Sequence, residues 1–424
     1  MLDIAFIREN PELIRQTALN KLVTVELDRL LELDLSLRQR ITVINEKRSL
    51  RNSLSKDIPT FAPDKKAEAV ETVRKLKEDL SALEKFYDAD RDEYDRIMLT
   101  VPSVPAPEVP VGRGEEDNVE IRRVGSVPDF AFAPKDHIEL AEALDIIEIP
   151  RAVKFAGSRS YILKNEGTLL ELGICRMVVD LLFARGFTPC VVPVMVKESA
   201  MTGTGYFPAG YEQAYKLTED ELYLAGTSEV PLVSIHQNEI LELESLPIKY
   251  AGYSTCFRRE AGTYGKDTRG LYRVHQFQKV EQVIFCENDE EIALAHHLEI
   301  LNNTEDVLKM LELPYRVALA CTGEIGIGQV RKHEVETWMP SRGNYCETHS
   351  CSTLGEFQAR RSNIRYRDRD GAVKFVYTLN NTGIASPRIL IPLLENFQQK
   401  DGSVVLPKAL VPYMNGIEVL EPKK

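Results

Sequence analysis

The sequence of 424 residues lacks long apolar runs and has few cysteines. No stretch approaches the roughly 20 consecutive apolar residues that a membrane-spanning helix needs, so we expect no membrane partner. The seven cysteines are scattered and odd in number, which argues against a disulfide framework and for a reducing compartment. The first residues, MLDIAFIREN, have neither the basic nor the apolar region of a signal peptide, and we therefore expect a cytoplasmic protein.

An excess of positive charge is also missing, because the formal net charge is −12. This excludes a protein coated in positive potential, and any RNA partner must be held by a local basic patch. Charged residues make up 28% and hydrophobic residues 43% of the chain, which is ordinary for a globular protein. The length exceeds that of one typical domain and predicts a large core with an appendage.

Residues 27–99 have the pattern of two long antiparallel helices, after a short helical segment at residues 1–22. Apolar residues recur at spacings of three and four on both sides of a turn at residues 59–63. The positions of this seam are Leu30, Leu33, Leu37, Ile41 and Ile44, then Val73, Leu76, Leu80, Leu83, Tyr87, Asp90, Tyr94 and Ile97. At 1.5 Å per residue each helix would be about 45–55 Å long. The narrow apolar stripe predicts a coiled-coil arm that projects into solvent.

The first helix of the predicted arm carries a basic edge near the turn. Its residues are Arg38, Arg40, Lys47, Arg48, Arg51 and Lys56, with few acids between them. Such an edge fits the phosphates of a long RNA. A solvated coiled-coil face is the alternative interpretation, because basic residues are common there.

Three segments follow from these patterns: an N-terminal domain at 1–100 with its arm, a linker at 101–134, and a main domain at 135–424. The linker is marked by six prolines and three glycines. In the main domain helical patterns alternate with strands whose neighbours look hairpin-linked. This predicts an α+β fold, an antiparallel sheet with flanking helices, rather than a regular βαβ alternation.

The centre of the main domain is the stretch from Thr255 to Glu281. We predict strands at Thr255–Glu260 and Leu271–Cys286, joined by a polar loop with Gly262, Gly265 and Gly270. Side chains alternate on a strand, so Arg258 and Glu260 would share a face, as would Arg273, Phe277 and Glu281. Such a surface offers guanidinium groups for phosphates, an aromatic ring that can stack on a base, and a carboxylate for an amine. This combination indicates binding of a nucleoside triphosphate together with a small amino acid. A solvated charged hairpin is the alternative.

Two further stretches carry candidate chemistry. In LYLAGTSEV, Thr227 and Glu229 would face the same way on an extended segment and suit a substrate ammonium group, unless they form only a turn before a helix near Pro231. In Glu334–Ser352, Glu347 and Ser350 offer two hard oxygens to Mg²⁺ bridging phosphates. Cys346, His349 and Cys351 lie in the same stretch, but their spacing spreads them over both sides of a strand without a fourth ligand, so no zinc is expected.

Together these motifs resemble the seryl-tRNA synthetases of the bacterial type, a family of class II aminoacyl-tRNA synthetases. FRRE, the loop, and RVHQFQKVE resemble motif 2 of that class, and TSE resembles the serine-pocket loop of the seryl-tRNA synthetases. The helix at 169–185 with the strand FTPCVVPVMV resembles motif 1, which forms the dimer interface in that family. Taken without the other motifs, this helix and strand fit an internal core element equally well. TLNNTGIASPR resembles motif 3, with Asn380, Asn381, Thr382 and Gly383 where many members have NGSG. The resemblance extends over the whole chain, from the arm to the C-terminal stretch.

The resemblance implies a class II antiparallel sheet and a homodimer that activates L-serine with ATP and Mg²⁺ and charges tRNA(Ser). It leaves open whether tRNA(Sec) is charged too. Arg258 would hold the α-phosphate, Arg388 the outer phosphates, and Phe277 would stack on adenine. The implied ATP-binding residues are Arg258, Arg259, Glu260, Val274, Phe277, Glu347, Thr348, His349, Ser350 and Arg388, of which Arg258, Glu347 and Arg388 are the catalytic ones. The implied serine-binding residues are Thr227, Ser228, Glu229, Arg258, Glu281, Asn380 and Thr382, and the implied tRNA-binding residues are Arg38, Arg40, Lys47, Arg48 and Arg51.

Three alternatives to a tRNA ligase are weighed against particular features. A relative that loads serine on a carrier protein would lack the arm, which this sequence has. A non-catalytic relative would have lost some of Arg258, Glu260, Glu281, Glu347 and Arg388, and all five are present. A structural coiled-coil protein would leave residues 101–424 unexplained.

Overall fold

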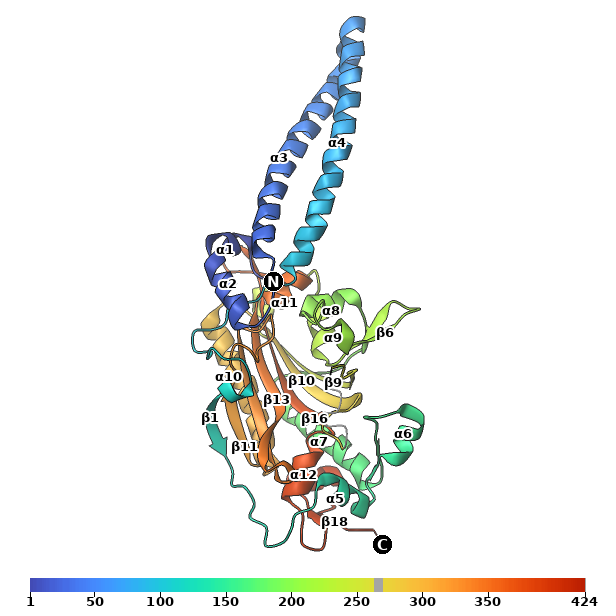
Figure 1. Ribbon diagram of the computed structural model, residues 1–424, viewed down its shortest axis with the longest axis vertical. Helices are drawn as coiled ribbons and strands as arrows, with labels where there is room; N and C mark the ends of the chain where they lie inside the picture. The colour runs from blue at the N-terminus through green and yellow to red at the C-terminus, as the bar shows by residue number, and fades with distance from the viewer. Residues whose placement is uncertain (263–269, 424) are drawn as a thin grey trace. The chain divides into compact units, whose positions relative to one another are not determined.

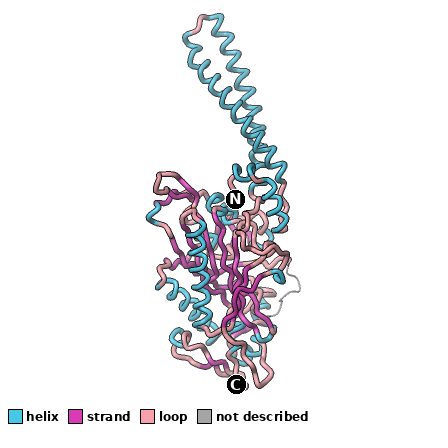
Figure 2. Tube along the Cα trace, turned by 90° about the vertical axis from the view of Figure 1, so that its left-hand side faces the viewer, coloured by secondary structure: helices cyan, strands magenta, loops and turns pink. Residues whose placement is uncertain are grey.

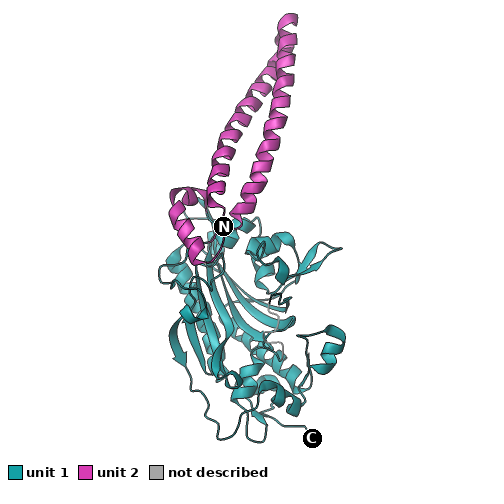
Figure 3. Ribbon diagram, viewed as in Figure 1, with its two compact units in different colours: residues 1–2, 103–424 teal, residues 3–102 magenta. Residues whose placement is uncertain are grey.

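The computed structural model describes residues 1–262 and 270–423. Gly265 of the predicted hairpin loop lies outside the described residues. The chain divides into two compact units, residues 3–102 and residues 1–2 with 103–424 (Figure 3). The limits of the three predicted domains stay predictions.

The smaller unit is a helical arm on a short helical base. It consists of α1 (Ile4–Glu9), α2 (Pro11–Asn20), α3 (Leu27–Asp57), η1 (Ile58–Thr60) and α4 (Pro63–Met98). Helices α3 and α4 run side by side as the long pair in Figures 1 and 2 and bury most of the predicted seam between them, while Ile41, Leu83 and Tyr87 are half-buried. The polar seam residue Asp90 accepts a hydrogen bond from Ser36 Oγ at 3.0 Å and pairs with Arg40 at 3.1 Å. The coiled-coil arm predicted from the sequence is confirmed.

The larger unit is built on an eight-stranded sheet in the described part of the chain. Its order is β1 (Val119–Val124), β11 (Tyr315–Leu319), β12 (Arg331–Met339), β13 (Asn344–Gly355), β16 (Tyr377–Ser386), β10 (Gln276–Cys286), β9 (Ile248–Phe257) and β4 (Thr188–Val191). Neighbouring strands are antiparallel except β4 and β9, which are parallel. The predicted α+β class with an antiparallel sheet is therefore confirmed.

Two long helices cover one face of the sheet. Helix α7 (Glu166–Ala184) packs on β9, β10 and β16, and α10 (Glu290–Met310) packs on β10, β13 and β16. Gln282 of β10 and Asn381 of β16 point to this face, since both donate hydrogen bonds to Ile300 O of α10. Because side chains alternate, the residues next to them point to the opposite face.

Shorter elements surround the sheet (Figure 1). The helices are η2 (Glu115–Asp117), α5 (His137–Leu144), α6 (Pro150–Ala156), α8 (Glu198–Thr204), η3 (Tyr211–Gln213), α9 (Glu229–Ser234), η4 (Leu243–Ser245), η5 (Pro340–Arg342), α11 (Phe357–Ser362), α12 (Leu390–Asn396) and η6 (Val411–Met414). The strands are β2 (Ile147–Glu148), β3 (Ile162–Leu163), β5 (Met195–Lys197), β6 (Tyr215–Leu217), β7 (Leu222–Leu224), β8 (Ile240–Glu242), β14 (Arg365–Arg367), β15 (Val373–Phe375), β17 (Val404–Val405) and β18 (Val419–Leu420). No helix in the part of the chain described is long and apolar enough to cross a membrane.

The proline-rich segment at 101–134 contains a strand that the sequence analysis did not predict. Strand β1 pairs with β11 at the edge of the main sheet. Upstream of it, Ser103 N and Ala106 N each donate a hydrogen bond at 2.9 Å, to Ile327 O and Val330 O. A proline-rich composition fixes an extended backbone but does not distinguish a tether from a segment laid along a sheet edge.

The central hairpin is shorter than predicted at its loop end. Strand β9 stops at Phe257 and β10 starts at Gln276, so Arg258, Glu260 and Arg273 are not strand residues. Glu260 adopts a left-handed backbone with φ of 52°, which no strand accommodates. The predicted alternation of Arg258 with Glu260, and of Arg273 with Phe277, is therefore wrong, while Phe277 and Glu281 do alternate on β10.

Candidate active site

A cavity of about 380 Å³ lies on the sheet face opposite α7 and α10. Strand β10 supplies three side chains in alternation, Phe277, Lys279 and Glu281, which all line it. Lys279 was not among the predicted site residues, although the same alternation identifies it. It forms an ion pair with Glu281, and both side chains are buried.

A β-bulge brings Glu347 and Ser350 to the same side of β13. Residues three apart on a regular strand face opposite ways. Here Val335 pairs with His349 and Glu336 pairs with Glu347, so Thr348 is an extra residue that shifts the register. Both Glu347 and Ser350 line the cavity as a result.

A second bulge, on β16, likewise turns two residues that are three apart in sequence to the same side of the strand. Val280 pairs with Ile384 and Glu281 pairs with Thr382, which leaves Gly383 as the extra residue. A Cβ at Gly383 would lie 3.1 Å from Val280 O and from Val178 Cγ1, tighter than an ordinary contact. Glycine thus fits the bulge, and Thr382 and Ala385 both line the cavity despite their odd spacing.

Arginine side chains line the cavity at Arg258 and Arg388. Arg388 Nη1 donates to Glu347 O at 3.1 Å and Nε donates to Tyr272 O at 3.2 Å. Arg258 Nε donates to Gly226 O at 3.3 Å, and its Cζ lies 5.2 Å from the centroid of the Phe277 ring. Each guanidinium is held by a main-chain oxygen and keeps further donors for an anionic ligand.

A buried acidic pocket lies among the same strands. Glu229 accepts hydrogen bonds from Tyr206 Oη at 3.1 Å, Gln358 Nε2 at 2.7 Å and Asn380 Nδ2 at 2.8 Å. Burial, and then the nearby charge of Glu281, raise the pKa of Glu229 to about 7. Burial also raises the pKa of Glu281, against the opposing effect of Lys279. Two buried carboxyl groups in one pocket favour a ligand that brings positive charge.

Tyr206 and Gln358 are further pocket residues that the sequence analysis missed. They come from the loop after α8 and from α11, and no motif in the sequence connects them with Glu229. Gln358 is itself fixed, because Thr378 Oγ1 donates to its Oε1 at 2.8 Å. Burial raises the pKa of Tyr206, which keeps its hydroxyl protonated as a donor.

Thr227 and Ser228 do not line the cavity. The extended segment predicted for Thr227 and Glu229 is wrong, since Glu229 begins α9 and Thr227 Oγ1 accepts from its backbone N–H at 3.2 Å. The turn interpretation is the one that the structure supports. Ser228 Oγ donates to Gly252 O at 2.9 Å beneath the pocket. A role of Thr227 and Ser228 in binding serine stays a prediction.

The remaining predicted ATP-binding residues differ in their placement. Val274, Thr348 and His349 line the cavity together with Glu260, whose Oε2 lies 3.4 Å from Arg273 Nη1. Arg259 lines a separate depression beside Tyr211 and Tyr215. Their roles in binding ATP stay predictions.

Two of the three residues considered for zinc, His349 and Cys351, have separate side-chain neighbours. His349 Nδ1 lies 2.9 Å from Thr348 Oγ1, and burial, followed by the charge of Arg388, lowers the pKa of His349 to about 3. Cys351 Sγ lies 3.6 Å from His297 Nε2. Among the described residues no three His, Cys, Asp or Glu side chains cluster as a metal-binding group. The absence of zinc stays a prediction.

The predicted tRNA-binding edge of the arm is largely paired with acids. Arg38 pairs with Asp34, Arg40 with Asp90, Lys47 with Asp79 and Arg48 with Glu84, at 2.7–3.1 Å. Arg51 instead donates to Asn52 Oδ1, at 2.8 Å and 3.2 Å. These pairs partly neutralise the edge, and Arg51 is the one of these five residues that binds an amide oxygen in place of a carboxylate.

Comparisons with known proteins cover the whole chain. Residues 1–105 match the family described as seryl-tRNA synthetase N-terminal domain, and residues 212–397 match the tRNA synthetase class II core domain (G, H, P, S and T). The serine–tRNA ligase of Deinococcus radiodurans is 46% identical over 99% of both chains. Among solved structures, the seryl-tRNA synthetase of Pyrococcus horikoshii complexed with ATP is 37% identical and superposes with a TM-score of 0.92 over 100% of both chains. The cytoplasmic serine–tRNA ligase of Naegleria fowleri in complex with AMP is 29% identical, with a TM-score of 0.87 over 100% of this chain and 99% of the other.

Proposed function

The chain belongs to the seryl-tRNA synthetases, a family of class II aminoacyl-tRNA synthetases, and we propose that it charges tRNA(Ser) with L-serine at the expense of ATP. Serine and ATP give seryl-adenylate and pyrophosphate, and the seryl group then passes to the 3′-terminal ribose of tRNA with release of AMP. The observation that carries the proposal is that one cavity joins Arg258 and Arg388 to the buried acids Glu229 and Glu281.

In the first step a serine carboxylate oxygen attacks the α-phosphorus of ATP, and the bond to the pyrophosphate oxygen breaks. No protein nucleophile is needed, because catalysis consists of alignment and of charge stabilisation at the phosphate oxygens. Arg258 is proposed to bind the α-phosphate and Arg388 the outer phosphates. Phe277, at the Arg258 end of the cavity, is proposed to stack on adenine.

Magnesium fits the arrangement of Glu347 and Ser350. The bulge at Thr348 turns one carboxylate and one hydroxyl oxygen toward the same cavity. Mg²⁺ is usually held by one or two carboxylates together with substrate phosphates and waters, and a complete protein cage is not required. Bound there, the ion would supply positive charge to the phosphate oxygens of ATP.

The acidic pocket is proposed to bind the ammonium and hydroxyl groups of serine. Glu229 and Glu281 provide negative charge, and Asn380 and Thr382 add polar groups on β16. A site that hydrogen-bonds a substrate hydroxyl rejects alanine, because its buried polar groups would be left unpaired. Threonine must be rejected by bulk.

The arm is proposed to bind the RNA through Arg38, Arg40, Lys47, Arg48 and Arg51. Four of these residues would have to exchange an acidic partner for a phosphate, whereas Arg51 would exchange only an amide. Exposed ion pairs are each worth about 0–1 kcal/mol, so the exchange costs little at Lys47 and Arg48. It costs more at Arg38 and Arg40, whose partners Asp34 and Asp90 are largely buried. Charging of tRNA(Sec) is left to experiment.

A homodimer is proposed from motif 1, and a cytoplasmic location from the seven cysteines, all of which are free thiols in the described part of the chain. Helix α7 and strands β4 and β5 expose Leu172, Phe183, Val191 and Met195, with Val191 85% and Phe183 66% exposed. An exposed group of large apolar side chains next to a sheet edge is typical of a protein interface. A second copy of the chain is the partner that the family resemblance supplies.

Serine-dependent ATP–pyrophosphate exchange, measured with each amino acid in turn, tests the function. Serine should support exchange at least about 100-fold better in kcat/KM than alanine, which lacks the hydroxyl. Faster exchange with another amino acid, or none with serine, would contradict the proposal.

A further inference from the structure

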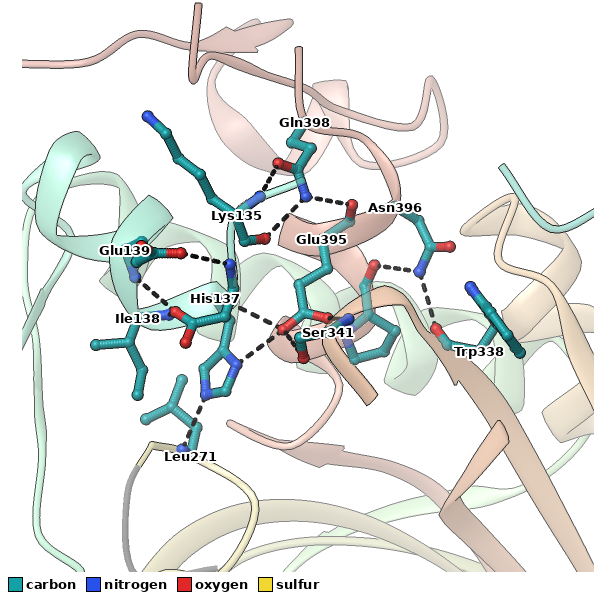
Figure 4. Close-up of polar contacts among 12 residues, drawn as sticks. Lys135, His137, Ile138, Glu139, Leu271, Trp338, Ser341, Glu395, Asn396 and Gln398 are labelled. Carbon is teal, nitrogen blue, oxygen red and sulfur yellow. Dashed lines mark hydrogen bonds and ion pairs between the residues drawn. The ribbon is translucent and has the colours of Figure 1, made fainter. Parts of the chain in front are cut away.

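A buried hydrogen-bond network lies beside the cavity, centred on Glu395 of α12 (Figure 4). The Glu395 side chain is fully buried and accepts four hydrogen bonds. His137 N and His137 Nδ1 lie 3.0 Å and 2.9 Å from Oε1, Ser341 Oγ lies 2.8 Å from Oε1, and Ser341 N lies 2.9 Å from Oε2. All four partners are donors to the carboxylate, whose oxygens need only accept.

The network also determines which nitrogen of His137 carries the proton. Nδ1 faces the Glu395 carboxylate and must be the donor. Nε2 faces the backbone N–H of Leu271 at 3.4 Å, so it must be the acceptor. A neutral imidazole with its proton on Nδ1 satisfies both contacts, and only that tautomer does.

Leu271 connects this network to the cavity, because it is hydrogen-bonded to His137 and also lines the cavity. Leu271 and Tyr272 both line the cavity, and Tyr272 O accepts the hydrogen bond from Arg388 Nε. The Tyr272 ring packs against two guanidinium groups, with Arg388 Cζ 4.3 Å and Arg342 Cζ 4.0 Å from its centroid. The main chain at 271–272 therefore holds the arginine that we assign to the outer phosphates.

The same network holds the other side of Tyr272. Arg342 follows directly on Ser341, which Glu395 binds through both its backbone and its hydroxyl group. Glu395 thus fixes His137 on one side and the η5 turn on the other, and the two converge on residues 271 and 272. Gly270 leaves room for this contact, because a Cβ there would lie 2.4 Å from His137 Nε2.

We propose that His137 is a positioning residue for ATP: anchored by Glu395, it accepts a hydrogen bond from Leu271 and so aligns Tyr272 and Arg388 in the cavity. This inference rests on the proposed function. His137 lies outside the cavity itself and acts only through residues 271–272. Its loss should therefore weaken the use of ATP and leave the serine pocket, formed around Glu229 and Glu281, as it is.

The test compares wild type with His137→Asn in serine-dependent exchange on the full-length protein. The amide nitrogen of asparagine can occupy the Nδ1 position and keep the bond to Glu395, but nothing then reaches Leu271. We expect KM for ATP to rise, or kcat to fall, by about tenfold with KM for serine within about twofold of wild type, as for loss of one buried hydrogen bond. His137→Gln, whose amide oxygen reaches the Nε2 position, should lie closer to wild type in its use of ATP.

Gln398→Ala is the matched control. Gln398 is buried next to Glu395 and binds Lys135 N at 2.7 Å and Lys135 O at 3.0 Å, but it has no contact with Leu271 among the described residues (Figure 4). The Gln398→Ala variant should have a lower melting temperature than wild type and an unchanged KM for ATP. Normal use of ATP by His137→Asn, or equal loss for ATP and serine in that variant, would overturn the inference. Absence of exchange in wild type would instead refute the proposed function.

Discussion

Arg388 Nη1 lies 3.6 Å from Glu347 Oε2 and 3.1 Å from the main-chain oxygen of Glu347. The residue that we assign to the outer phosphates of ATP is thus in contact with the carboxylate that we assign to magnesium. An ion and an arginine that share one polyphosphate must stand this close, because both neutralise neighbouring oxygens.

Arg388→Ala is expected to abolish serine-dependent exchange, with a loss of about 100-fold or more in kcat/KM. The reason is that the variant removes a fixed positive charge from the phosphates, while Arg388→Lys keeps the charge and should retain part of the activity. Pyrophosphate exchange measures both. Arg123→Ala on β1, whose partner is Glu120, is a control that should be active. Near-normal exchange in Arg388→Ala would remove this residue from the mechanism.

Glu347→Gln should raise the Mg²⁺ concentration needed for half-maximal exchange by about tenfold, because an amide oxygen is a weaker ligand for a hard cation than a carboxylate. A titration of exchange activity with MgCl₂ at fixed ATP measures the shift. Glu336→Gln is a suitable control, since Glu336 pairs with Glu347 across β12 and β13 but is bound to Arg316 at 2.7 Å. An unchanged magnesium requirement in Glu347→Gln would contradict the assignment.

Deletion of residues 35–92 with a short glycine linker should spare exchange and stop the charging of tRNA. Among the described residues, those that line the cavity all follow residue 114, so we expect the first step not to need the arm. Within the full arm, Arg51→Glu should weaken charging and reduce its salt dependence, because one phosphate contact is lost. Aminoacylation at several salt concentrations measures both effects. Persistent charging by the deletion variant would show that the arm is not the tRNA-binding element.

The raised pKa of Glu229 predicts a loss of stability as pH rises. The ordinary pKa of 4.5 applies to the unfolded chain and about 7 to the folded one, so the folded state binds the extra proton between these values. Stability from this group is full below about pH 4.5 and is lost as pH rises to 7, by up to about 3 kcal/mol. Glu229→Gln should therefore gain stability relative to wild type between pH 5 and pH 8 in urea unfolding. A difference in unfolding free energy between Glu229→Gln and wild type that stays constant from pH 5 to pH 8 would contradict this prediction.

Bound serine should restore the stability that the wild type loses as pH rises, because the ammonium group of serine compensates the charge of the Glu229 carboxylate. Serine affinity is then expected to increase as pH rises from 6 to 8, with release of a proton on binding. Calorimetry in buffers of different ionisation enthalpy measures the released proton. Binding that is independent of pH would place the ammonium group elsewhere.

Phe183→Asp combined with Val191→Asp should convert a dimer into monomers in analytical ultracentrifugation, since two buried charges would be placed in an apolar interface. Phe155→Asp is the control, because Phe155 is 78% exposed on α6 and outside the motif 1 surface. A dimer that survives the double substitution would place the interface on another surface.

Much of the fold and part of the site could be predicted from local patterns. The spacing of Leu30, Leu33 and Leu37 marked the arm, because burial on one helical face repeats every three to four residues. Alternation on β10 placed Phe277 and Glu281 on one face, and it would also have placed Lys279 there. The loop ends of the central hairpin strands were predicted wrongly. Arg258 and Arg273 have strand-like neighbours in the sequence, but they lie outside the paired residues of β9 and β10.

The sequence by itself determined most of the local elements and indicated candidate residues for the chemistry, because periodicity and motif spacing are properties of neighbouring residues. The tertiary structure alone decided which of them meet. Glu347 and Ser350 share a face only through the bulge at Thr348, and Glu229 meets Glu281 only because α9 packs on β10. Register shifts and long-range packing depend on the free energy of the whole core, which no short stretch of sequence contains.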